Sequence, residues 1–144
     1  MGPGHQGRRA IRGLNDPSKD SGLPMAALLF DSITEAVGVG AGRVVISGSH
    51  GGVSSARYAL QTAPRLAVFN DAGSGKDGAG IAALVLLQAR GIAACTVAHT
   101  SARIGEARST LEEGIVSHLN ERAASLGLAV GQPLRPVVEA LTAA

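Results

Sequence analysis

A chain of 144 residues is long enough to bury one hydrophobic core, and its composition excludes several classes of function. Aromatic residues make up only 2% of the chain, so few rings are available to stack on nucleic-acid bases. The formal net charge of +2 comes from the first twenty residues, beyond which basic and acidic residues are equal in number. We therefore expect no nucleic-acid partner.

The sequence also indicates a cytoplasmic protein with no membrane partner. It has no run of about 18 apolar residues and no apolar signal-peptide segment. Its one cysteine, Cys95, cannot form an internal disulfide, which is typical of a reducing compartment. Because the hydrophobic residues are mainly aliphatic and bury little area each, we expect a homo-oligomer in which a second subunit completes the core.

The chain is predicted to divide into a flexible arm and one folded domain. Residues 1–22 mix Gly, Pro, Arg, Asp and Ser without a period, which predicts a flexible arm, and residues 23–144 form a single α/β domain. Phe30 and Ile33 favour a strand in the first apolar run, although such a run is also compatible with a helix start. Gly38–Gly42 predicts a turn, because its G-x-G-x-G pattern precedes a strand and not the helix of a phosphate loop.

Three apolar segments that precede polar loops are predicted to be strands: Arg43–Ser47, Leu66–Phe69 and Ile92–Val97. Each runs into a loop rich in glycine or polar residues: Gly48–Gly52, Asn70–Asp77 and Ala98–Gly105. The first loop leads to a helix that Ser54 or Ser55 caps and that ends at Ala63, and the second leads to a helix over Ile81–Ala89.

A long helix is predicted after the third loop. Ser109–Glu112 matches a capping box, and an apolar stripe runs from Leu111 to Ala123 at helical spacing. Gly114 would cost about 1 kcal/mol relative to alanine inside that helix, which indicates close packing at this point. Residues 130–144 contain a proline-bearing linker and a short amphipathic segment, predicted to be a terminal helix or an oligomer contact.

These repeated strand, loop and helix units predict the fold. Parallel strands joined by right-handed crossovers lie side by side, so all three loops meet at one edge of the sheet. We therefore expect a Rossmann-like α/β domain of two or three layers, with a mainly parallel sheet of three to five strands and crossover helices.

The second loop contains a G-x-G-x-x-G pattern formed by Gly73, Gly75 and Gly78. A dinucleotide fingerprint would begin directly after the strand and would have a carboxylate about 20 residues further on. Here Asn70 and Asp71 intervene, and no carboxylate lies at the required distance. A triphosphate loop would need a glycine at the position of Asn70 and a hydroxyl at the position of Asp77. Because the sequence meets neither pattern, it identifies no cofactor, and the cofactor is left as unknown.

The first loop surrounds His50 with glycine. Glycines allow a substrate to approach the backbone and the imidazole together, and an unperturbed histidine titrates near neutral pH. We interpret His50 as a catalytic acid or base, with Ser49 and Gly51 in substrate binding. The alternative is a tight turn with a solvated histidine.

The second loop places opposite charges directly after a strand. Neighbouring charges at such a position shift one another's pKa values, as acid–base catalysis requires. We interpret Asp71 and Lys76 as catalytic, with Asn70, Gly73 and Gly75 in substrate binding. The alternative is an ion pair between Lys76 and an aspartate that only holds the loop together.

The third loop supplies Ser101 and Arg103, which we interpret as substrate-binding residues. Arginine forms a forked contact with carboxylate or phosphate, and serine can donate to the same anion. A surface ion pair between Arg103 and Glu106 is an equally strong alternative.

Other polar residues are given other interpretations. Asp77 is best interpreted as a helix N-cap, and His118 is placed on the long helix. His99 remains open between a site role and a solvated one. Cys95 is interpreted as a small buried hydrophobic residue and not as a nucleophile.

Together these residues predict an enzyme of the hydrolase, lyase or isomerase type that performs acid–base catalysis on a small anionic molecule. The alternative function is a nucleotide- or cofactor-binding module without chemistry. Two other arrangements lack the motif spacing that would support them. They are a triad of Ser49 or Ser101 with His50 and Asp71, and a metal site drawn from His50, His99, Asp71 and Asp77.

Overall fold

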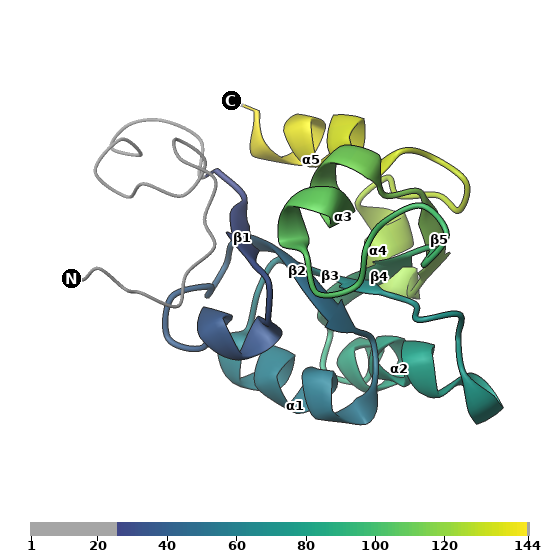
Figure 1. The fold of residues 1–144 in the computed structure, drawn as a ribbon. Helices are drawn as coiled ribbons and strands as arrows, with labels where there is room; N and C mark the ends of the chain where they lie inside the picture. The colour runs from purple at the N-terminus through teal and green to yellow at the C-terminus, as the bar shows by residue number, and fades with distance from the viewer. Residues whose placement is uncertain (1–25, 144) are drawn as a thin grey trace.

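The computed structural model describes residues 26–143, which form one sheet with helices on both faces (Figure 1). The predicted flexible arm lies outside the described residues. The strands are β1 (Leu28–Phe30), β2 (Val44–His50), β3 (Leu66–Asn70), β4 (Ala93–Val97) and β5 (Val116–Leu119).

The helices are α1 (Val53–Thr62), α2 (Ala82–Gln88), α3 (Ala107–Glu113), α4 (Glu121–Ser125) and α5 (Leu134–Thr142), with 3-10 helices at Ile33–Ala36 and Lys76–Ile81. α5 confirms the predicted terminal helix. Within residues 26–143, no helix has both the length and the apolar character needed to cross a bilayer.

The strands follow one another across the sheet in chain order, from β1 to β5. β1 to β4 are parallel, and β5 is antiparallel to β4. This confirms the predicted α/β fold with a mainly parallel sheet. The carboxyl ends of β1 to β4 and the start of β5 therefore meet at one edge, which we call the carboxyl edge.

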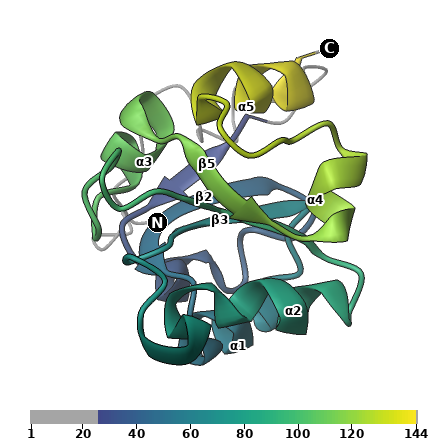
Figure 2. The same ribbon diagram turned by 90° about the vertical axis from the view of Figure 1, so that its right-hand side faces the viewer.

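Alternate residues of each strand enter two separate cores, because successive side chains point to opposite faces of a sheet. Ala67 and Phe69 pack under α1 and α2 in one core, whereas Leu66 and Val68 contribute to the core beneath α3 and α5. Figures 1 and 2 show α1 and α2 on one face of the sheet and α3 and α5 on the other. These are the α1–α2 layer and the α3–α5 layer.

The predicted long helix is wrong. The chain forms α3, then β5, then the short helix α4 over the same residues. Gly114 leaves the helix with φ −66° and ψ 137°, and a Cβ there would collide with the Thr110 carbonyl oxygen and lie 2.6 Å from Val97 Cγ1. The apolar residues from Leu111 to Ala123 have helical spacing, but the segment after Gly114 forms a strand because its backbone pairs with β4.

Two predicted helix starts also differ from the structure. The N-cap of α1 is Gly52, and Ser55 instead donates its hydroxyl to the His50 carbonyl oxygen at 2.6 Å. Asp77 lies inside the 3-10 helix with φ 55°, so it is not the N-cap of α2, which begins only at Ala82.

Candidate functional site

The carboxyl edge is partly closed by the loop between β4 and α3. This loop runs back across the ends of the neighbouring strands. Asn70 at the end of β3 donates from Nδ2 to the Ala102 carbonyl oxygen at 3.1 Å, and the Gly105 amide donates to the Gly48 carbonyl oxygen at 2.7 Å. Asp31 after β1 then accepts from the Ala107 amide at 2.9 Å, at the start of α3.

The remaining opening lies between the ends of β3 and β4. The chain leaves β3 toward the α1–α2 layer and leaves β4 toward the α3–α5 layer (Figures 1 and 2). In open α/β sheets, loops that diverge in this way create the crevice in which ligands bind. Asp71 follows β3 directly, and His99 lies in the loop after β4, so both residues lie at this crevice.

Asp71 is a buried carboxylate held in its charged form. Its side chain is 7% exposed. Burial raises the pKa of the Asp71 carboxyl, but hydrogen bonds from the Gly73 amide, the Ser117 hydroxyl and the His99 amide and ring outweigh it and lower the pKa below its ordinary value. The Gly73 and His99 amides donate to Oδ1 at 2.7 and 3.0 Å.

Two imidazoles flank this carboxylate. Nδ1 of His99 lies 3.3 Å from Asp71 Oδ1, and Nδ1 of His118 lies 3.8 Å from Asp71 Oδ2. The His99 side chain is 54% exposed and the His118 side chain 39% exposed, so a ligand can reach both rings. A carboxylate at Nδ1 places the ring hydrogen on Nδ1 and leaves Nε2 available as an acceptor.

A β-bulge in β5 places His118 at this site. Thr96 pairs with His118 and Val97 with Val116, so Ser117 is the extra residue. A bulge re-aims the side chains beside it, and here Ser117 and His118 both contact Thr96. The Thr96 hydroxyl lies 2.9 Å from the Ser117 hydroxyl and 3.4 Å from His118 Nδ1.

We call these five side chains the Asp71 cluster: Asp71, Thr96, His99, Ser117 and His118. Sequence reasoning proposed Asp71 as a site residue and left His99 open, but it missed the other three. Thr96 lies within a strand, and Ser117 and His118 were assigned to a helix. The run Ile115-Val116 after a glycine was the available signal, since β-branched residues in succession favour a strand.

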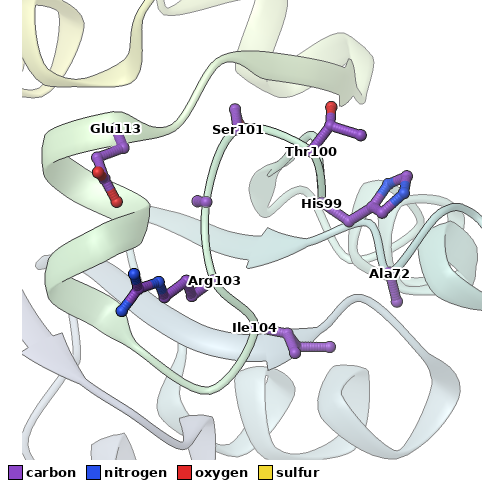
Figure 3. A pocket seen from close by; sticks show the side chains of 8 residues that line it. Ala72, His99, Thr100, Ser101, Arg103, Ile104 and Glu113 are labelled. Carbon is purple, nitrogen blue, oxygen red and sulfur yellow. The ribbon is translucent and has the colours of Figure 1, made fainter.

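A pocket of about 540 Å³ opens beside His99. It is lined by Ala72, His99, Thr100, Ser101, Ala102, Arg103, Ile104 and Glu113 (Figure 3). The figure shows that Arg103 extends from the loop toward α3, which carries Glu113, while His99 extends from the opposite side of the loop toward Ala72. The pocket therefore offers a cation at one end and an imidazole at the other.

No protein family, curated protein or solved structure matches this chain.

Gly51 of the first loop lies against the Asp71 cluster, because a Cβ there would be 3.1 Å from Thr96 Cγ2, whereas Ser49 and His50 make other contacts. His50 is exposed, and its ring folds over Gly52, where a Cβ would lie 2.9 Å from the ring. The Ser49 hydroxyl accepts from the Ile33 amide at 3.0 Å. Gly51 is packed so closely that a Cβ would lie 2.7 Å from the Gly80 carbonyl oxygen, so its glycine is needed for packing.

The glycines of the second loop are needed for its backbone conformation. Gly73 and Gly75 have φ of 75° and 68°, values that favour glycine. The His99 ring lies against Gly73, where a Cβ would be 3.5 Å from Cε1. Lys76 is exposed at the start of the 3-10 helix. Asn70 is fully buried, and its Oδ1 accepts from the Ala72 amide at 2.8 Å, so it supports the loop.

The proposed residues of the third loop both line the pocket, but Ser101 is committed to local structure. Its hydroxyl donates to the Ala98 carbonyl oxygen at 2.7 Å and accepts from the Ile115 amide at 3.0 Å. The Arg103 amide donates to the Ser109 hydroxyl at 2.9 Å, which holds the backbone while the guanidinium remains exposed.

The two weaker arrangements are not supported. Over residues 26–143, no three His, Cys, Asp or Glu side chains are placed together as ligands of a metal ion. The triad would require Ser49 or Ser101 to approach His50 and Asp71, yet both hydroxyls are bonded to backbone groups elsewhere. Cys95 is fully buried, as predicted.

Proposed function

We propose that this protein is a small-molecule enzyme of the hydrolase, lyase or isomerase type in which His99 transfers a proton to or from an anionic substrate. One observation carries the proposal. A buried, ionised carboxylate, Asp71, lies against the exposed imidazole of His99 at the crevice between diverging loops. A carboxylate behind an imidazole orients the ring and stabilises its protonated form, which is the arrangement that general acid–base catalysis uses.

In this proposal His99 takes the role that the sequence analysis assigned to His50. Nδ1 of His99 donates toward Asp71, and Nε2 accepts a proton from the substrate or returns one to it. The Asp71 carboxylate remains ionised throughout, because its hydrogen bonds keep its pKa low. The reaction class follows from this proton transfer, and hydrolysis, elimination and isomerisation all employ it.

Arg103 is the group in the same pocket that supports an anionic substrate. Arginine is always charged and presents a fork that matches a carboxylate or phosphate. Because Arg103 and His99 extend to opposite sides of the loop (Figure 3), the anionic group and the reacting group belong to opposite ends of the substrate. A pocket of about 540 Å³ is in the range that small-molecule ligands occupy.

A ligand screen followed by a turnover assay tests this proposal. Small carboxylates, sugar phosphates and nucleotides are screened by thermal shift, because a ligand of the folded state raises its stability. Each ligand found is then incubated with the protein and followed by NMR for product. We expect His99→Gln to lower turnover by about 10²- to 10⁴-fold with binding retained, and Arg103→Met to weaken binding.

His50→Gln is the matched control, since His50 is also an exposed histidine at the carboxyl edge. It should leave binding and turnover unchanged. Equal losses in His50→Gln and His99→Gln would contradict the assignment of His99. Ligands that bind through Arg103 and are never converted would favour the alternative function, a nucleotide- or cofactor-binding module.

A further inference from the structure

A second, apolar groove lies between α2 and β5. It has a volume of about 610 Å³, and its lining includes Val53, Asp77, Val85, Leu86, His118 and Leu119. Its apolar side chains are unusually open to solvent: Val85 is 73% exposed and Val53 49% exposed. Isolated exposed valines are ordinary, but apolar side chains that line one groove indicate a binding surface.

The groove is continuous with the Asp71 cluster. His118 lines the groove, and its Nδ1 lies 3.8 Å from Asp71 Oδ2. The pocket beside His99 approaches the same carboxylate at Oδ1, where Nδ1 of His99 lies at 3.3 Å. The Asp71 carboxylate therefore stands between two openings, of which the pocket beside His99 is the more polar, and each is lined by one of its two histidines.

The shape and composition of the groove fit a small molecule better than a protein. Among its lining residues only Asp77 and His118 carry titratable side chains, and apolar walls with a few polar groups are typical of small-molecule sites. A stable protein interface involves about 20–30 residues on each side, whereas ten residues line this groove.

We propose that this groove binds the aliphatic or aromatic part of a small-molecule ligand whose polar group meets His118. The ligand class that follows is an amphiphilic one, in which a hydrogen-bonding group such as a hydroxyl carries an apolar chain or ring. The assignment of this ligand as a substrate rests on the proposed function, but its binding in the groove can be measured without turnover.

Two series of probes of increasing length test the groove directly. Straight-chain carboxylates from acetate to octanoate, and the matching primary alcohols, are titrated into the full chain and followed by amide and methyl NMR shifts. Each methylene buried in the groove should tighten binding by about twofold to fourfold, the upper value applying to a fully buried group. The shifts should concentrate at Val85, Leu86 and Leu119.

Val85→Glu is the informative variant, because this exposed side chain can be replaced without disturbing the core. It should abolish the dependence of affinity on chain length. Val130→Glu is the matched control, since Val130 is 64% exposed and lies outside the groove. It should leave the chain-length dependence as in the unmodified protein.

Three results would overturn the groove proposal. The first is an affinity that does not change with chain length, and the second is an equal effect of Val85→Glu and Val130→Glu on that dependence. The third is a dimer that Val85→Glu converts to monomer while the probes do not bind. The last would make the groove an interface between two copies. If affinity depends on chain length but no ligand is turned over, the groove proposal stands and the proposed catalysis is contradicted. If a ligand is turned over but affinity does not depend on chain length, the proposed catalysis stands and the groove proposal is contradicted.

Discussion

At the scale of single residues, the proposed chemistry depends on Asp71 first. Its carboxylate is nearly buried, which is unfavourable for a charge, yet two amides, a hydroxyl and an imidazole stabilise the ionised form. The buried carboxylate stays ionised because these groups donate hydrogen bonds to it. Its contact with Nδ1 in turn orients the His99 ring. Replacing Asp71 should therefore affect both the stability of the fold and the pH dependence of that stability.

Asp71→Asn should destabilise the fold by about 1–3 kcal/mol at neutral pH, since the amide cannot replace every hydrogen bond of the carboxylate. The pKa of Asp71 is lower in the folded state than in the unfolded state. The ionised carboxylate therefore contributes its full share of the free energy of unfolding above its unfolded pKa of about 4, and this share is lost as the pH falls through the folded pKa. Urea unfolding from pH 7 to pH 2.5 should thus show the stability gap between the two proteins closing below about pH 4. Asp77→Asn, at an exposed position, is the control, and a constant gap would contradict this account.

Burial makes the thiol of Cys95 unreactive in the folded protein. It is fully buried in β4, and desolvation raises the pKa of its thiol to about 12. The thiolate is the reactive form, so native protein at pH 8 should react with a thiol reagent only at the rate at which it unfolds. Reaction with Ellman's reagent, with and without urea, measures this. Fast labelling of the native protein would contradict the buried position.

At the scale of secondary structure, Asn120 joins three elements. It caps α4 by accepting from the Ala123 amide, and its Oδ1 also accepts from the Ala94 amide of β4. Its Nδ2 donates to the Leu84 and Ile92 carbonyl oxygens at 3.1 and 2.9 Å, which attaches α2 and the start of β4 to the same side chain.

Asn120→Ala should therefore cost about 2–4 kcal/mol, more than a helix cap alone, because buried backbone groups lose their partners. Asn120→Asp should also be destabilised, since it keeps the acceptor and loses both donated bonds. Urea midpoints of these variants measure the effect, with the exposed neighbour Glu121→Ala as control. A loss below about 1 kcal/mol in Asn120→Ala would show that Asn120 acts only as a cap.

The bulge at Ser117 is the other element-scale feature that bears on function. Without the extra residue, Ser117 and His118 would alternate between faces of the sheet, as residues in a regular strand do. The bulge instead brings both hydroxyl and imidazole to Thr96 and Asp71. Two of the five side chains of the Asp71 cluster thus depend on one irregular position in one strand pair.

At the scale of the whole molecule, the change of layer after β4 creates the site. Every parallel crossover between β2 and β4 passes through the α1–α2 layer, and the chain enters the α3–α5 layer only after β4 (Figures 1 and 2). The loops of β3 and β4 diverge as a result. The crevice at Asp71 and His99 follows from this topology, and the two histidines of the cluster come from the loop after β4 and from the strand after α3.

The same architecture predicts how stability is distributed. All five residues of β3 are buried between two paired neighbours, whereas β5 lies at the edge of the sheet and carries the bulge. Amides of β3 should exchange hydrogen only by global unfolding, and those of Ser117 and His118 should exchange faster by local opening. Hydrogen exchange followed by NMR measures this order. Equal protection of β3 and β5 would mean that the edge opens only with the whole domain.

The local sequence was sufficient for those features whose physical causes are themselves local. Apolar β-branched runs predicted β2, β3 and β4, glycine and proline marked their ends, and right-handed crossovers then required a parallel sheet with its loops on one edge. Asp71 could be proposed because a carboxylate directly after a buried strand must lie at that edge. The expectations of a homo-oligomer and of an anionic ligand concern partners, and they stay predictions.

Only the tertiary structure decided which polar residues meet. Ser49 and His50 end β2 and Asp71 follows the neighbouring strand β3. Ser49 nevertheless bonds to the Ile33 amide and the His50 ring lies over Gly52, while Asp71 is contacted by side chains from β5 and from the loop after β4. The segment after Gly114 has helical spacing, and it forms a strand because β4 offers it an unpaired edge. Pairing across the sheet is a long-range interaction that no local pattern contains, and it is this pairing that brings His118 to Asp71.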